Sequence, residues 1–156
     1  MISYNHLPLE LKPCFLYFGI HPEDFEIPMR QLIQLWIAEG FIQQTGMRKK
    51  EDVAEDYLEE LIDRSLIQVA TKRIDGGVKT CRIHDLLRDF CISESAEEKF
   101  LAVHSDFNLS PMRKSRRISI HYANHQYISS SLVNFQIVVL KLPWEGLLGS
   151  RVLLIE

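Results

Sequence analysis

The fold is decided by residues 67–85, which read IQVATKRIDGGVKTCRIHD. Ile67 and Val69 alternate with polar residues, and this period of two predicts a β-strand. Asp75-Gly76-Gly77 predicts a tight turn, after which the segment Thr80–Ile83 returns as a second strand. The pattern then changes to that of a helix, which we expect to begin at about Asp85. Its apolar residues are Leu86, Leu87, Phe90 and Cys91.

Three helical segments precede this hairpin. The first opens at Asn5, a residue that can cap a helix, and ends at Gly19, with a bend or a late start expected at Pro13. The second runs from Pro28 to Gly40 and the third from about Glu51 to Ser65. Apolar residues recur at helical spacing in all three, namely Leu7, Leu11, Cys14, Phe15 and Phe18, then Met29, Leu32, Ile33, Trp36 and Ile37, then Val53, Ala54, Tyr57, Leu58, Leu61 and Ile62. Three helices followed by a hairpin predict a mainly α fold with a small β-hairpin, a winged-helix domain.

The composition is that of an ordinary globular protein. The 156 residues are 46% hydrophobic and 25% charged, which excludes disorder and coiled coil as the main architecture. The net charge of −3 argues against non-specific binding to nucleic acid or acidic membrane. An odd number of cysteines without a close pair (Cys14, Cys81 and Cys91) indicates a reducing compartment. Because neither a signal peptide nor an apolar run of about 18 residues is found, we expect a soluble, intracellular protein without a membrane span.

The character of the chain changes at about Ser105. Ser110-Pro111 and the basic cluster Arg113, Lys114, Arg116 and Arg117 indicate a junction, and strands are expected around Ile118 and over 135–140. Leucines then recur from Leu140 to Leu154 at repeat-like spacing, without the length that several repeats require. We therefore divide the chain into a winged-helix domain, 1–104, and a linker with an incomplete leucine-rich-repeat start, 105–156. Because the sequence stops within an apolar run, we expect further repeats to follow.

Four stretches of the sequence resemble the plant intracellular immune receptors that carry an NB-ARC nucleotide-binding module and leucine-rich repeats, in their coiled-coil class. They are Leu7-Pro8 with Leu11-Lys12, Cys14-Phe15-Leu16-Tyr17 and Pro22-Glu23-Asp24; Leu32-Ile33 with Leu35-Trp36-Ile37-Ala38-Glu39-Gly40-Phe41-Ile42; Ala54 with Tyr57-Leu58-Glu59-Glu60-Leu61 and Arg64-Ser65-Leu66-Ile67; and Arg82-Ile83-His84-Asp85-Leu86-Leu87-Arg88-Asp89. The resemblance implies that residues 1–104 are the winged-helix (ARC2) subdomain of the NB-ARC module. It also implies that the tail leads into the leucine-rich repeats.

Ile83, His84 and Asp85 are similar to the family's Met-His-Asp motif, with isoleucine in place of methionine. The resemblance implies that His84 reaches the phosphates of bound ADP and helps to hold a closed, inactive state. The position suits an anion, since His84 lies at a strand-to-helix junction where helix amides attract negative charge. Asp85 can cap the same helix start. The alternative is that His84 is a plain junction residue and Asp85 merely a cap.

Nucleotide and metal chemistry are incomplete in this chain. A phosphate-binding Gly-x-x-x-x-Gly-Lys-Ser/Thr motif does not occur, so we expect the nucleotide-binding core to lie before Met1. ADP or ATP is then a cofactor of the full-length receptor, and none is expected for this fragment alone. Cys81-x-x-His84 is half a zinc site, so no metal site is predicted.

The function that the resemblance implies is a regulatory latch in plant defence. ADP would keep the receptor off, and exchange for ATP after pathogen sensing would permit the hypersensitive response. The implied partners are the upstream nucleotide-binding domain, the downstream repeats, and a pathogen effector or helper receptor, in the cytoplasm or at the inner face of the plasma membrane. The alternative function is DNA binding, which the acidic third helix disfavours because a recognition helix needs basic residues. Catalysis is not expected, since no nucleophile–base pair or metal set can be assembled.

Overall fold

The computed structural model describes residues 2–44, 46–98, 100, 102–104, 117–120, 136–139 and 153–155. These described residues fall into two compact units, the first made of those within 1–18 and 23–91 and the second of those within 19–22 and 92–156. The predicted boundary between residues 104 and 105 stays a prediction.

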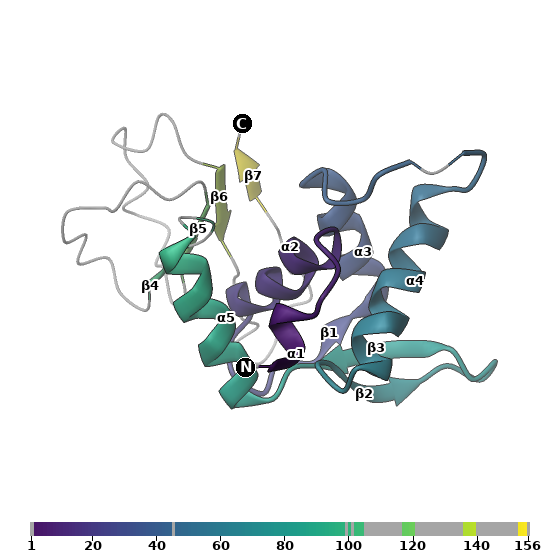
Figure 1. The fold of residues 1–156 in the computed structure, drawn as a ribbon. Helices are drawn as coiled ribbons and strands as arrows, with labels where there is room; N and C mark the ends of the chain where they lie inside the picture. The colour runs from purple at the N-terminus through teal and green to yellow at the C-terminus, as the bar shows by residue number, and fades with distance from the viewer. Residues whose placement is uncertain are drawn as a thin grey trace, which may run out of the picture. The chain divides into compact units, whose positions relative to one another are not determined.

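The N-terminal segment is divided into short helices and is not one long helix (Figure 1). Helix α1 spans Ile2–Asn5, α2 spans Leu11–Leu16, and a 3-10 helix, η1, spans Tyr17–Ile20. Asn5 therefore ends a helix, and the prediction that it caps one is wrong. The late start expected at Pro13 is confirmed: this proline is the third residue of α2, within the first turn, where a missing N–H removes no helical hydrogen bond.

Helices α3 (Met29–Ala38) and α4 (Lys50–Asp63) pack against each other (Figure 1). Both end in the same way. After α3, Gly40 at φ +77° donates to Ile37 O and Phe41 donates to Trp36 O, which is a Schellman motif. After α4, Ser65 takes the left-handed position at φ +59°, a conformation that disfavours any residue with a Cβ.

A three-stranded antiparallel sheet completes the first unit, in the order β1-β3-β2. Strands β2 (Gln68–Lys72) and β3 (Val78–Arg82) are the predicted hairpin, joined by a turn in which Gly76 has φ +88° and the Asp75 carboxylate accepts from the Gly77 amide. Strand β1 (Ile27–Pro28) pairs with β3 through Ile27 to Cys81 and Pro28 to Thr80. Pro28 therefore belongs to a strand and occupies the N-cap position of α3 without a side-chain capping hydrogen bond, and α3 starts one residue later than expected.

The core of the first unit contains most of the predicted apolar residues, together with Leu16, Tyr17 and Ile27, which the helical spacing did not mark; Leu86, by contrast, is exposed. The largest fully buried side chains of this core are Phe15, Leu16, Tyr17, Phe18, Ile27, Leu32, Trp36, Leu58, Leu61 and Ile67. Phe18 and Trp36 meet edge to face with ring centroids 6.0 Å apart, a favoured arrangement of aromatic rings. The first unit is thus mainly helical with one small sheet, and the predicted winged-helix fold class is confirmed.

Helix α5 (Asp85–Glu97) begins at the predicted residue. The described strands of the second unit are β4 (Ala102–His104), β5 (Arg117–Ile120), β6 (Gln136–Val139) and β7 (Leu153–Ile155). Strands β4, β5 and β6 are parallel neighbours, whereas β7 runs antiparallel to β6. Strands β5 and β6 coincide with the two expected strands. The residues around Ser110-Pro111, most of the basic cluster and the leucines from 140 to 148 lie outside the described residues, and the leucine-rich-repeat start stays a prediction.

Candidate functional site

The candidate site is the link between β3 and α5, and its first residue is anchored in the core. Ile83 follows the last residue of β3 directly, and only 7% of its surface is exposed. His84 and Asp85, the next two residues, are both exposed. The three motif residues therefore form a junction in which a buried apolar side chain fixes the backbone and two polar side chains face outward.

His84 is the N-cap of α5. Its carbonyl accepts the amides of Leu87 and Arg88, both at 2.9 Å, and thereby starts the helical hydrogen-bond ladder. Its Nδ1 accepts the amide of Leu86 at 3.3 Å. A side-chain acceptor bonded to the second amide of a helix satisfies one of the donors that the first turn leaves without a partner. The predicted cap is thus present, but His84 provides it and not Asp85.

Asp85 is the first residue inside α5, one position later than predicted for a cap. Its negative charge lies at the positive end of the helix dipole, where a carboxylate stabilises a helix by about 0.3–1 kcal/mol. Because the Leu86 amide bonds to His84, the contribution of Asp85 to the helix start is electrostatic.

Arg88 is the residue of this junction that the sequence analysis missed. It lies one turn after His84 and is buried, with 7% of its surface exposed, and its guanidinium Nη1 is 3.7 Å from Glu23 and 3.8 Å from Asp89. The pair with Glu23 joins α5 to the loop before β1. The signal in the sequence is that Arg88 occupies a helical position between Leu87 and Cys91, within the predicted apolar face.

The three cysteines are buried and free. Cys81 Sγ lies 3.8 Å from Ile27 O, across the pairing of β3 with β1, and Cys91 Sγ lies 3.4 Å from Phe15 O. Burial raises the pKa of the Cys81 thiol to about 12, and it raises those of Cys14 and Cys91 further. Among the residues that the structure describes, no three His, Cys, Asp or Glu side chains are grouped so that they could hold a metal ion. Within the same residues, no helix is both long and apolar enough to cross a membrane.

Comparison with known proteins defines the class of the domain. The family described as disease resistance protein winged helix domain matches residues 20–91, which include the sheet, the junction and the first half of α5. Through this domain the chain belongs to the plant disease resistance proteins.

The similar proteins come from several plants. The chain is 43% identical over 127 residues to the tomato (Solanum lycopersicum) protein ToMV resistance protein Tm-2(2), covering 79% of this chain and 15% of that protein. It is 43% identical over 134 residues to a putative disease resistance RPP13-like protein 3 of Arabidopsis thaliana, covering 85% and 16%. It is 54% identical over 100 residues to the putative late blight resistance protein homolog R1B-11 of Solanum demissum, covering 64% and 8%. The chain therefore spans about one-sixth or less of the length of these relatives.

Proposed function

We propose that this chain works as the regulatory winged-helix part of a larger plant disease resistance receptor, where it acts as a latch that responds to ADP or ATP. The observation that carries the proposal is the double role open to His84. One ring nitrogen is used to cap α5, and the exposed ring leaves the other free to contact a ligand.

The capping bond determines which nitrogen carries a proton. Because the Leu86 amide is a donor, Nδ1 must accept with its lone pair, and the proton of a neutral imidazole then lies on Nε2. An Nε2–H group on an exposed ring is a suitable donor to a phosphate oxygen. It also lies at the N-terminal end of a 13-residue helix, where the dipole favours an anion. His84 would thus hold a nucleotide phosphate, which supplies the charge that the latch senses.

The residues around His84 support a coupled movement. Ile83 fixes the junction to the core, and the Arg88–Glu23 pair holds the first turns of α5 against the loop before β1. A displacement of His84 would therefore move the whole domain and not only the loop that carries it. A ligand shifts a two-state equilibrium only through contacts that differ between the two states, and a phosphate contact at His84 would be such a contact.

The exposed side chain of Leu86 suggests where a partner would pack. It is 74% exposed, two residues after His84, although large apolar residues are usually buried. We propose that the nucleotide-binding domain of the parent receptor covers this residue in the closed state. Release of that contact, with ATP in place of ADP, would permit activation and the hypersensitive response, in the cytoplasm or at the inner face of the plasma membrane.

The structure gives DNA binding little support. Helix α4 is the third long segment before the hairpin, the place of a recognition helix, and it carries seven acidic residues: Glu51, Asp52, Glu55, Asp56, Glu59, Glu60 and Asp63. Phosphate contacts require lysine and arginine, so this helix would be repelled by a duplex. The hairpin of β2 and β3, which is the wing of this fold, contributes Lys72, Arg73 and Lys79 near its tip.

The test uses the parent receptor purified from plant tissue. His84→Ala should reduce the ADP that co-purifies with the receptor and should cause cell death in leaves without a pathogen. A variant that accumulates normally, stays silent and retains ADP like the wild type would contradict the latch. A salt-dependent mobility shift with duplex DNA, tested on the 156-residue chain, would instead support the DNA alternative.

A further inference from the structure

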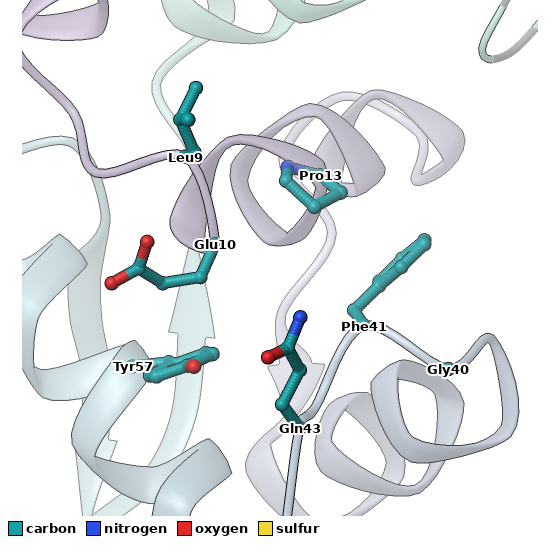
Figure 2. A pocket seen from close by; sticks show the side chains of 7 residues that line it. All are labelled: Leu9, Glu10, Pro13, Gly40, Phe41, Gln43 and Tyr57. Carbon is teal, nitrogen blue, oxygen red and sulfur yellow. The ribbon is translucent and has the colours of Figure 1, made fainter.

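The first unit contains an open cavity of about 570 Å³. The residues that line it do not include His84 or its neighbours at the β3–α5 junction. Figure 2 shows its lining side chains around a common space, with Glu10 and Tyr57 on one side and Phe41 on the other. The lining comes from the start of α2, the loop after α3 and the middle of α4. Its residues are Leu9, Glu10, Pro13, Gly40, Phe41, Gln43 and Tyr57.

The two opposite walls of this cavity have different origins. The Schellman motif at Gly40 reverses the chain after α3 and directs Phe41 against Tyr17, where the rings meet edge to face with centroids 5.5 Å apart. On the opposite wall, Glu10 is the N-cap residue of α2, yet its side chain makes no capping hydrogen bond. One wall is thus the ring of Phe41, which packs against Tyr17. The other wall is the carboxylate of Glu10, which does not cap the helix.

The electrostatics of the cavity favour a cation. Burial raises the pKa of the Tyr57 hydroxyl, and the nearby negative charge of Glu10 raises it further. The Glu10 carboxylate forms no ion pair or hydrogen bond with any residue that the structure describes. None of the seven lining residues is basic, and the neighbouring helix α4 carries an excess of carboxylates. A carboxylate beside aromatic rings, without a basic partner, is complementary to a positive charge.

We propose that this cavity binds an arginine side chain presented by a partner protein. A guanidinium can stack on the rings of Tyr57 and Phe41 while its N–H groups bond to the Glu10 carboxylate and the Gln43 amide oxygen, a combination that suits its planar shape. An anion would be repelled by Glu10. A purely apolar side chain would remove water from Glu10, Gln43 and the Tyr57 hydroxyl without replacing their hydrogen bonds.

The test is a titration of the 156-residue chain, followed by the NMR shifts of its backbone amides. The probe is the blocked peptide acetyl-Gly-Arg-Gly-amide, and the control peptide carries citrulline, which has nearly the same shape as arginine without the charge. We expect the arginine peptide to shift the amides of Phe41, Gln43 and Tyr57 and to bind at least about tenfold more tightly than the citrulline peptide.

A matched pair of variants locates the charge. Glu10→Gln should reduce the affinity for the arginine peptide to that for the citrulline peptide, whereas Glu59→Gln, which removes one exposed charge from α4, should leave it within about twofold. Equal binding of both peptides, or equal effects of both variants, would overturn the proposal. If a lysine peptide bound as tightly as the arginine peptide, the guanidinium assignment would be wrong. If the parent receptor failed to bind a peptide that the chain binds, the site would be filled within the receptor, and a separate partner would be excluded.

Discussion

Replacing His84 by asparagine should separate its capping role from its proposed contact with the nucleotide. Asparagine is among the best N-cap residues, so its side-chain oxygen can accept the Leu86 amide as Nδ1 does. Its side chain is too short, however, to present a donor where Nε2–H lies. His84→Ala removes both functions.

The size of each effect follows from the geometry. The capping distance of 3.3 Å is longer than the usual 2.9–3.0 Å, so we expect the lower half of the range for a cap, about 0.5–1 kcal/mol, to be lost in His84→Ala. His84→Asn should leave the unfolding free energy within about 0.5 kcal/mol of the wild type. A hydrogen bond to a charged phosphate contributes about 1.5–3 kcal/mol, so both variants should hold ADP about 10- to 150-fold more weakly in the parent receptor.

Two measurements decide between these roles. Urea unfolding of the 156-residue chain reports the cap, and the ADP that remains on the parent receptor after dialysis reports the phosphate contact. If His84→Asn destabilised the chain as much as His84→Ala, the cap assignment would be refuted. If His84→Asn retained ADP like the wild type, Nε2 would have no part in nucleotide binding.

Three further predictions concern the packing of the domain. Leu61→Ala should lower the free energy of unfolding by about 2–5 kcal/mol, because Leu61 is fully buried, while Glu59→Ala on the exposed face should change it by less than about 0.5 kcal/mol; urea titration checks both. Ser65→Gly should raise stability by up to about 1 kcal/mol because glycine adopts a φ of +59° without strain, and a Ser65→Ala variant that gained as much would disprove this reason. Burial raises the pKa of the thiols of Cys14, Cys81 and Cys91 and leaves little thiolate at about pH 8. A thiol reagent should therefore label the folded chain at least about tenfold more slowly than the urea-unfolded chain. Rapid labelling of the folded chain would mean that a thiol is accessible.

The elements that the sequence predicted well are those with strong local signals. The hairpin follows from the alternation after Ile67 and from the Asp75-Gly76-Gly77 turn. The end of α3 at Ala38 follows from Gly40, which takes the left-handed conformation just after the helix. Strand β1 was missed because two residues, one of them a proline, show no alternation. It is formed by pairing with Thr80 and Cys81, far along the chain. In the N-terminal segment the apolar residues are buried as expected. Their spacing alone, however, did not reveal that the helix is interrupted between α1 and α2.

The candidate site shows the same division between local and tertiary information. Its place at the start of a helix was predictable, but the identity of the cap was not, since Asp85 is intrinsically the better capping residue and His84 takes the role only because the helix starts at residue 85. Arg88 was missed because its role at the junction depends on an ion pair with Glu23, and a separate loop brings that carboxylate within 3.7 Å of the guanidinium.

The position of Pro28 at the rim of the sheet affects how this domain behaves in concentrated solution. Strand β1 is an edge of the β1-β3-β2 sheet, it has two residues, and one of them lacks an N–H group. A neighbouring molecule that tried to extend the sheet there would find at most one amide with which to pair. Natural proteins use short edge strands and edge prolines to prevent uncontrolled strand-to-strand aggregation. This edge of the sheet can therefore be exposed without recruiting a strand from another molecule.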